Sequence, residues 1–255
     1  MSATVSARPE QRFSNRVENY VRHRPGYPQD ILPLLQRKTG LGKTSVVADI
    51  GSGTGISTGL FLQAGCQVHA VEPNAAMRAA AEKGLRESPG FRSVAGTAQA
   101  TTLPDASVDI ITAAQSFHWF DTPETRAEFS RILKPGGHVV LIWNERQVDA
   151  TPFLRDYEQL LLDYASDYQE VRHENISHSH LGRFFSGPYA AHQFYNEQRF
   201  DFEGLKGRTL SSSYTPPEDH PLHAPLLYAL RRLFDLHQQT GEVVMEYVTQ
   251  VYIGH

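Results

Sequence analysis

The feature that most constrains this chain is a run of glycines directly after a short apolar segment. The stretch "VVADIGSGTG" starts at Val46 and places Gly51, Gly53 and Gly55 at every second position. Glycines at this density let the backbone adopt turns that other residues avoid and approach a neighbour or a ligand closely. The β-branched residues before them predict a buried strand that ends at Asp49. A buried strand that runs into a glycine loop and then a helix is typical of α/β proteins.

The first half of the chain alternates between predicted strands and helices. After the first strand, at 45–49, further strands are expected at 67–72, 91–96, 108–114 and 138–143, and helices at 57–65, 74–84 and 122–133. This alternation implies right-handed crossovers and a parallel sheet with helices on both faces.

Helix ends are predicted from capping residues. Ser57 or Thr58 is expected to cap the first helix. Asn74 is expected to cap the second helix, and Gly84 is expected to end it. Thr122, followed by a proline, is expected to cap the third.

The second half has a different pattern. Helices are expected at 151–168 and 225–239, and strands at 190–202 and 242–254. The stretch around His173, His178 and His180 has no regular ligand spacing and is expected to be a loop without a metal. The two closing strands suit an antiparallel edge on an otherwise parallel sheet.

Composition excludes several classes of protein. The 255 residues carry a net charge of −4 with both signs mixed, so no basic surface for nucleic acid or membrane is expected. Cys66 is the single cysteine, which excludes an internal disulfide and a cysteine-built metal site, and it is expected to be an inert core thiol. Without a signal-like or membrane-spanning apolar segment, the chain is expected to be soluble and cytoplasmic.

Two nucleotide-binding loops compete for the glycine segment. A phosphate-binding loop would need its lysine after the strand, but Gly42-Lys43-Thr44 precedes it, and Arg37 stands at the first glycine position. A dinucleotide loop would need its third glycine where Ile56 stands. An NAD(P)-dependent oxidoreductase therefore remains only an alternative.

The remaining pattern, an acidic residue followed by alternating glycines, resembles the class I S-adenosylmethionine-dependent methyltransferases. The resemblance rests on "VVADIGSGTG", "VHAVEPNAAM", "GTAQATTLPDASVDII" and "ILKPGGHVVLIW", which follow in order over roughly residues 45–145. The segments "NYVRHRPGYP" and "QSFHWFD" are similar to the type 11 group of small-molecule methyltransferases, which includes relatives acting on trans-aconitate and in ubiquinone biosynthesis.

The resemblance implies a fold. We expect a Rossmann-like, doubly wound, mostly parallel seven-stranded sheet with an antiparallel last strand and helices on both faces. Residues 1–255 would form one domain with a lid segment at about 1–40, a core at about 45–145, an acceptor-side insertion at about 146–190 and closing elements at about 190–255.

The resemblance also implies a cofactor, S-adenosyl-L-methionine, with S-adenosyl-L-homocysteine as product. Its expected contacts are Asp49, Gly51, Ser52, Gly53, Gly55, Glu72, Pro73, Met77, Thr97, Ala98 and Gln115. Asp49 suits the cofactor's ammonium, directly or through water, and Glu72, about 20 residues beyond the loop, suits the ribose hydroxyls. The alternatives are a helix-capping carboxylate for Asp49 and a solvated strand end for Glu72.

The adenine contacts depart from the family. Pro73 and Met77 would flank the ring, or merely pack a helix. Where the family often has Gly-Asp-Ala-Glu, this chain has Gly96-Thr97-Ala98-Gln99. The adenine contact is therefore expected from the hydroxyl of Thr97 and the backbone of Ala98.

Acceptor-side residues are expected at the carboxyl ends of the first and fourth strands. His118 could act as a general base or hold the acceptor, with Trp119 as a pocket wall, or the aromatic residues could only pack this loop. Catalysis would rest mostly on alignment, because the cofactor supplies the activated methyl group.

Four further residues are expected near the rim. Asn144 and Arg146 follow the fifth strand, where Arg146 could clamp a carboxylate or lie on the surface. Tyr20 and Arg24 fall where relatives close a lid, although Tyr20 could instead pack a helix. The N/D-P-P-Y tetrapeptide of nucleic-acid and glutamine methyltransferases is absent. A small-molecule acceptor is expected, with an O-, N- or C-nucleophile left open and a non-catalytic binding module as the alternative.

Overall fold

The computed structural model describes residues 17–165, 168, 178–185 and 187–255, without the side chains of 18–20 and 178–180. Its helices are α1 (Val17–His23), α2 (Ile31–Thr39), α3 (Ile56–Gln63), α4 (Ala75–Leu85), α5 (Pro123–Ile132), α6 (Pro152–Tyr164), α7 (His178–Phe185), α8 (Phe202–Leu210), α9 (His223–His237) and the 3₁₀ turn η2 (Phe117–Trp119). Its strands are β1 (Val46–Ile50), β2 (Gln67–Val71), β3 (Phe91–Val94), β4 (Val108–Ala114), β5 (Leu133–Arg146), β6 (Ala190–Phe200) and β7 (Val243–Gly254).

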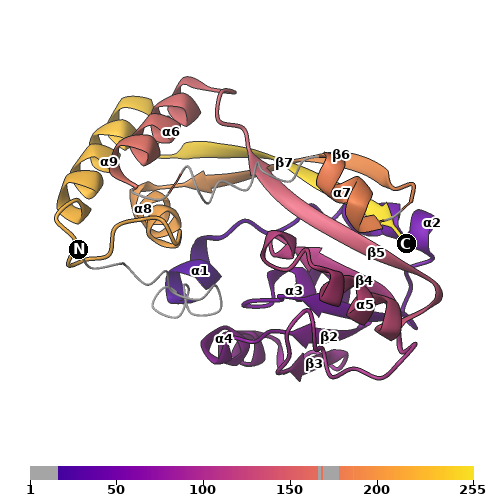
Figure 1. The fold of residues 1–255 in the computed structure, drawn as a ribbon. Coiled ribbons are helices and arrows are strands. Elements are labelled where there is room, and N and C mark those ends of the chain that lie inside the picture. Colours follow the sequence, from indigo (N-terminus) through magenta and orange to yellow (C-terminus); the bar gives the residue numbers. More distant parts are fainter. Residues whose placement is uncertain (1–16, 166–167, 169–177, 186) are drawn as a thin grey trace.

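One sheet of seven strands organises the molecule (Figure 1). The strand order is β3-β2-β1-β4-β5-β7-β6, with β7 antiparallel to both of its neighbours and the other pairs parallel. This confirms the Rossmann-like mostly parallel sheet with an antiparallel last strand. The order reverses between β1 and β4, which is where such sheets bind ligands at their carboxyl edge.

Alternate residues of the central strands pack against opposite faces of the sheet. Val47 lies in a core with α2 and α3, and the next residue, Ala48, lies in a second core with α5 and α7. This is the period of two that a strand buried on both sides requires. Cys66 is buried in the first of these cores, and its burial raises the thiol pKa, as expected for an inert core residue.

A third core lies at the far end of the long strands. Helices α6, α8 and α9 gather there beyond the parallel part of the sheet (Figure 1). They pack on the ends of β6 and β7 around Leu205, Leu230 and Met245, which are fully buried. Helix α8 was not expected from the sequence, because its glycines and polar residues give a weak helical pattern.

Several predicted helix ends are confirmed and others are wrong. Asn74 and Thr122 cap α4 and α5 through their side-chain oxygens, as predicted. Gly84 does not end α4, which continues to Leu85. Neither Ser57 nor Thr58 caps α3. Both hydroxyls instead donate to the buried carboxylate of Asp49, which is a strong acceptor because it carries charge.

The histidine segment is also corrected in part. A helix, α7, covers His178–Phe185 where a loop was expected, because Leu181, Phe184 and Phe185 pack on the sheet. His173 and the side chains of His178 and His180 fall in the part that the structure leaves undescribed.

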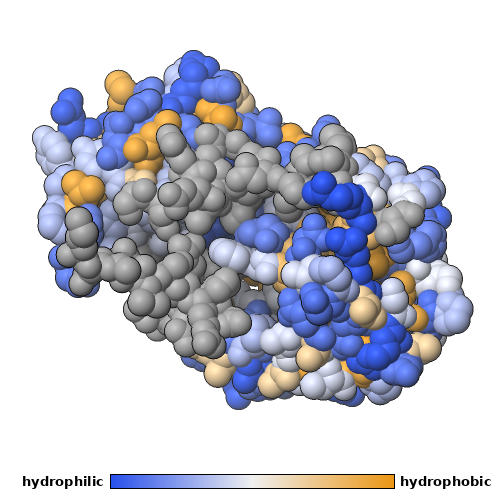
Figure 2. Space-filling view, in the orientation of Figure 1, coloured by the Kyte–Doolittle hydropathy of each residue, from blue (hydrophilic) through white to orange (hydrophobic). Residues whose placement is uncertain are grey.

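The surface is mixed. On the face shown in Figure 2, apolar residues stand in small groups among hydrophilic ones. Within the described ranges, no helix is long and apolar enough to cross a membrane.

Candidate active site

The glycine loop crosses the carboxyl edge of β1 with three left-handed residues. The φ angles of Gly51, Gly53 and Gly55 are 67°, 57° and 87°. A Cβ on Gly51 would lie 2.8 Å from that of Ser116, and one on Gly55 would lie 2.6 Å from the side chain of Leu85. A Cβ on Gly53 would have no described atom within 4 Å. The outer two glycines therefore serve packing, and the middle one borders open space.

Asp49 is a fully buried carboxylate at the end of β1. Its Oδ2 accepts hydrogen bonds from Ser57 Oγ at 2.7 Å and Thr58 Oγ1 at 2.6 Å. Its Oδ1 is buried without a hydrogen-bond partner in the described part of the chain. Burial raises its pKa to about 6, against the opposing effect of the two hydroxyls, so it is ionised at neutral pH.

Other buried oxygens near the loop share this condition. The hydroxyls of Ser52, Thr54 and Thr112 are buried and have no partner among the described residues. Thr112 is the register partner of Asp49 on β4, so both side chains lie on one face of the sheet. Buried polar atoms are normally hydrogen-bonded, and a cluster of exceptions beside a loop fits a polar ligand. An ammonium is the group that the charge of Asp49 suits.

Glu72 closes the loop from the neighbouring strand. Its Oε2 accepts from Gly53 N at 2.9 Å, and its Oε1 accepts from Asn74 N at 2.8 Å. The side chain is 8% exposed, which excludes a solvated strand end, and burial raises its pKa. The sequence suggested that both oxygens face ribose hydroxyls; in the structure each already accepts one backbone N–H. A carboxylate oxygen has two lone-pair sites, so each can accept one more hydrogen bond.

The predicted adenine contacts lie on both sides of this carboxylate. Met77 is buried in α4, and Pro73 is exposed before that helix. Thr97 and Ala98 lie in a tight turn after β3, where Thr97 N donates to Ala100 O at 3.1 Å and Ala98 is buried. The structure is thus compatible with an adenine site between α4 and this turn, which stays a prediction.

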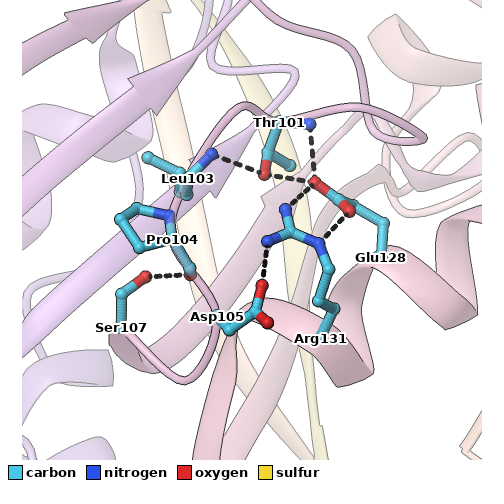
Figure 3. Close-up of polar contacts among 7 residues, drawn as sticks. All are labelled: Thr101, Leu103, Pro104, Asp105, Ser107, Glu128 and Arg131. Carbon is cyan, nitrogen blue, oxygen red and sulfur yellow. Dashed lines mark hydrogen bonds and ion pairs between the residues drawn. The ribbon is translucent and has the colours of Figure 1, made fainter.

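A charged network fixes the chain just after that turn (Figure 3). Glu128 Oε1 accepts from the backbone N and the hydroxyl of Thr101, at 2.8 and 2.5 Å. Arg131 donates to both oxygens of Glu128 at 2.8 Å and to Asp105 at 2.6 Å. The Arg131 guanidinium lowers the pKa of Glu128 to about 2. Helix α5 therefore holds the segment in place.

The chain leaves β4 through a strained residue. Gln115 has a φ of 56°, and its N donates to Ile142 O at 2.9 Å. Its Oε1 accepts from Asn144 N at 2.5 Å, so this predicted cofactor residue ties β4 to β5. A non-glycine residue in the left-handed region is uncommon and often marks a functional site.

His118 and Trp119 follow in the turn η2. Trp119 is 38% exposed, and the His118 ring stacks near it with centroids 4.6 Å apart. His118 also lies 6.5 Å from the ring of Trp143, which is buried in β5. Phe117 packs against Phe120 and Trp143, so part of this loop does serve packing, while Trp119 stays available for an acceptor.

Asn144 has a tertiary role that the sequence did not reveal. Its amide donates to Gly26 O at 3.1 Å, and its Oδ1 accepts from Asn196 at 3.1 Å and from Thr249 at 2.6 Å. It joins β5, β6, β7 and the N-terminal segment at one point. These three hydrogen bonds occupy the Asn144 side chain, which therefore does not stand open at the rim.

Arg146 and Arg24 also point inward. Arg146 Nη2 donates to Glu158 at 2.5 Å and to the hydroxyl of Tyr168 at 2.6 Å, so it is not a surface arginine. Arg24 Nη2 donates to Ser211 O at 3.1 Å, at the end of α8. The side chain of Tyr20 lies outside the described residues, although its backbone belongs to α1.

Sequence reasoning missed several residues that hold the site. Ser57 and Thr58 carried a signal, but it was interpreted as capping. Glu128 and Arg131 stand three apart on α5, a helical ion-pair spacing that could have drawn attention. Arg208 carried no sequence signal. Among the described residues no three His, Cys, Asp or Glu side chains form a metal-binding group.

Comparison with known proteins adds the family. Residues 48–141 match the family profile described as a methyltransferase domain. An uncharacterised methyltransferase-like protein of Schizosaccharomyces pombe is 33% identical over 61% of this chain and 59% of its own length. An uncharacterised methyltransferase of Mycobacterium tuberculosis is 36% identical over 52% of each chain. The match thus spans about half to three fifths of these relatives.

Solved structures share the fold at low identity. The YcgJ protein of Bacillus subtilis superposes with a TM-score of 0.56 at 21% identity, covering 89% of this chain and 97% of the other. A geranyl diphosphate methyltransferase in complex with S-adenosylmethionine superposes with a TM-score of 0.50 at 16% identity, covering 88% and 84%.

The family implies S-adenosylmethionine as cofactor, and the residues at the loop fit it. Asp49 offers a buried, ionised oxygen for an ammonium, Gly53 borders open space, and Glu72 retains acceptor capacity beside both. The sheet order, the profile matched by residues 48–141 and these relatives show that the chain is similar to the class I S-adenosylmethionine-dependent methyltransferases of the type 11 group.

Proposed function

We propose that this protein transfers a methyl group from S-adenosylmethionine to a small-molecule acceptor. The observation that carries the proposal is the buried Oδ1 of Asp49, which is ionised at neutral pH and lacks a partner in the described part of the chain. An unpaired buried charge is costly, and a bound ammonium would offset that cost.

Each residue then has a task. Asp49 holds the ammonium, and the loop from Gly51 to Gly55 lies against the amino-acid end, with Gly53 at the closest approach. Glu72 keeps the loop in shape through Gly53 N and accepts from the ribose. The bound cofactor supplies a methyl group already activated on a sulfonium, so the protein contributes alignment and exclusion of water.

The acceptor is expected beyond the carboxyl ends of β1 and β4. Trp119 is the exposed aromatic surface there, and His118 beside it is the residue placed to take a proton from an acceptor that is still protonated. The absence of the N/D-P-P-Y tetrapeptide and the mildly acidic net charge favour a small molecule over nucleic acid.

Calorimetry tests the proposal directly. We expect wild-type protein to bind S-adenosylhomocysteine and to show no binding of NADH under the same conditions. Asp49→Asn should weaken that binding at least tenfold, while Asp163→Asn, an exposed residue on α6 that pairs with Gln159, should leave it unchanged. NADH binding without a response to S-adenosylhomocysteine would instead support an oxidoreductase.

A second measurement separates an enzyme from a binding module. Wild-type protein should form S-adenosylhomocysteine from S-adenosylmethionine in a broad screen of small-molecule acceptors. His118→Gln should lower the rate with the responsive acceptor and leave cofactor affinity intact. Normal cofactor binding with no turnover over the whole screen would favour the non-catalytic module.

A further inference from the structure

Two buried arginines, Arg146 and Arg208, lie near the C-terminal helices and share the neighbours Tyr157 and Tyr214. Arg208, on α8, is 7% exposed. It donates to the hydroxyl of Tyr247 at 3.4 Å and to that of Ser212 at 3.1 Å, and its partners are therefore neutral. No ion pair to Arg208 is present among the described residues.

Arg146, at the end of β5, forms one ion pair but keeps one buried nitrogen without a described hydrogen-bond acceptor. Its guanidinium stacks over the ring of Tyr157 at 4.9 Å and donates through Nη2 to Glu158. Its Nη1 is buried and has no hydrogen-bond partner in the described ranges, and its side chain is 12% exposed. A buried guanidinium N–H without an acceptor costs free energy, which a ligand oxygen would recover.

The electrostatic effect converges on one phenol. Burial alone would raise the pKa of Tyr214, but Arg208, Arg146 and Arg24 together lower it below its usual range. Tyr214 packs edge-on against Tyr168, whose hydroxyl meets Arg146. The three arginines thus create a positive potential in one small volume, which we call the arginine cluster (Arg24, Arg146 and Arg208).

The cluster lies next to the carboxyl edge of the sheet. Arg146 is two residues beyond Asn144 on β5, so both side chains lie on the same face, and Asn144 N is bonded to Gln115 where β4 ends. Arg24 is two residues before Gly26, to which Asn144 donates. Helix α1, which leads into Arg24, lies between α8 and α4 (Figure 1). The glycine loop, which precedes α3, borders α4 as well, because a Cβ on Gly55 would lie 2.6 Å from the side chain of Leu85.

We propose that the arginine cluster binds a carboxylate group of the methyl acceptor and so sets the substrate class as small carboxylic acids. That the bound anion is the methyl acceptor rests on the proposed function, whereas the existence of an anion site does not. The three arginines of the cluster outnumber Glu158, the carboxylate that pairs with Arg146, so the cluster suits an anion. The guanidinium fork pairs with the two oxygens of a carboxylate. A carboxylate held in this way serves as a handle, and the atom that receives the methyl group lies elsewhere on the acceptor.

The first experiment measures anion binding without any cofactor. Succinate should raise the melting temperature of the wild-type protein in a saturable manner, and succinamide, its uncharged analogue, should not, both at constant ionic strength. Inorganic phosphate should act more weakly than succinate. An equal response to succinamide, or a stronger one to phosphate, would overturn the assignment to carboxylates.

Variants locate the response. Arg208→Gln should weaken the succinate response at least tenfold in concentration, measured against the variant's own baseline. Arg146→Lys keeps the charge and removes Nη1, so it should also weaken the succinate response. This variant provides the test if Arg208→Gln does not fold. Arg86→Gln is the control, because Arg86 is an exposed arginine with a 72% exposed side chain. Loss of the response in Arg86→Gln, or its retention in Arg146→Lys, would contradict the proposal.

The second experiment connects the cluster to methyl transfer. In the acceptor screen, acids should exceed their primary amides at least tenfold in kcat/KM, and Arg146→Lys should raise KM for the acid more than it lowers kcat. Binding of S-adenosylhomocysteine is measured in parallel. If the cofactor binds but succinate does not, only the carboxylate site fails. If succinate binds but the cofactor does not, the methyltransferase proposal fails and the anion site stands.

Discussion

At the scale of single residues, the buried carboxylate of Asp49 lowers the stability of the free protein, and in the proposed function it binds the ammonium of the cofactor. A pKa raised from 3.8 to about 6 means that the folded protein favours the protonated form. At about 1.36 kcal/mol per pKa unit, keeping the carboxylate ionised at pH 8 costs about 3 kcal/mol of stability, as an upper bound. The protein therefore gains stability from Asp49 when this carboxyl is protonated. That gain is fully present below pH 3.8 and is lost as the pH rises through 6.

Asp49→Asn should therefore separate stability from binding. Without a buried charge, the free variant should be as stable as wild type at pH 8 or more stable by about 1–3 kcal/mol. Its affinity for S-adenosylhomocysteine should fall at least tenfold. In the wild type, affinity should fall as the pH drops below 6, because protonation removes the charge. Denaturant unfolding and calorimetry over pH 5–8 provide both quantities; an Asn variant that binds normally would rule out this role.

Gly53 offers a second test. Gly53→Ala should cost about 1–2 kcal/mol of stability, because its φ of 57° is left-handed, and it meets no described atom. Gly40→Ala is a matched control, since Gly40 has a φ of 70° and similar open space. Both variants should lose similar stability, but only Gly53→Ala should lose the thermal shift given by S-adenosylhomocysteine. Similar ligand shifts in both would show that the loop does not face the ligand.

Glu72 is expected to act on ligand and loop together. Glu72→Ala removes the acceptor for Gly53 N as well as the ribose contacts, so cofactor affinity should fall about tenfold to thousandfold. Because Glu72 is buried and bonded, a stability loss of about 1–3 kcal/mol should accompany it. Calorimetry and unfolding separate the two effects. Unchanged affinity with collapsed stability would make Glu72 purely structural.

At the scale of elements, α5 acts as a support for the chain after β3. Glu128 and Arg131 on this helix hold Thr101 and Asp105, which lie shortly after the turn predicted to contact adenine. Helices that pack on a sheet can in this way position a loop at the sheet's edge without touching the ligand. The lowered pKa of Glu128 shows that the native state prefers its ionised form.

Glu128→Gln should lower stability by about 1–3 kcal/mol, since it weakens several charge-assisted hydrogen bonds. In the wild type this contribution is fully present above pH 4.5 and is lost as the pH falls through about 2. The difference in unfolding free energy between variant and wild type should thus shrink on acidification. Glu87→Gln, a change at a side chain that is 94% exposed, is the control. A difference that stays constant with pH would contradict this account.

At the scale of the whole molecule, the N-terminal segment, the parallel sheet and the C-terminal strands meet at Asn144. This one amide contacts Gly26, Asn196 and Thr249, which are distant in sequence. The arginine cluster lies immediately beyond it. Under the proposed function, the carboxyl edge of the sheet would be shared by a cofactor side, from the first half of the chain, and an acceptor side, from the N-terminal segment and the C-terminal strands.

Asn144→Ala should loosen this junction. Because it leaves the buried hydroxyl of Thr249 without its acceptor, we expect a stability loss of about 2–3 kcal/mol. Asn196→Ala, in a part-buried contact with the same residue, should cost less, about 1 kcal/mol, because it leaves no fully buried hydroxyl without an acceptor. Chemical denaturation provides the comparison. Equal losses would mean that Asn144 is not the centre of the junction.

The sequence alone determined the sheet, the helices α3, α4, α5, α6 and α9, and the place of the glycine loop. Those features depend on local periodicity, capping residues and glycine spacing, which are written in neighbouring residues. Asp49 and Glu72 could be singled out because each ends a predicted strand at a fixed distance from the glycines.

Only the tertiary structure decided how those carboxylates are used. The hydroxyls of Ser57 and Thr58 bond Asp49, and Glu72 bonds the loop's own backbone, because folding brings those donors within reach. Arg146 and Arg208 are 62 residues apart in the sequence, and only the fold brings both of them near Tyr214. Hydrogen bonds and charges between distant segments have no period along the chain, so a single sequence carries no local sign of them.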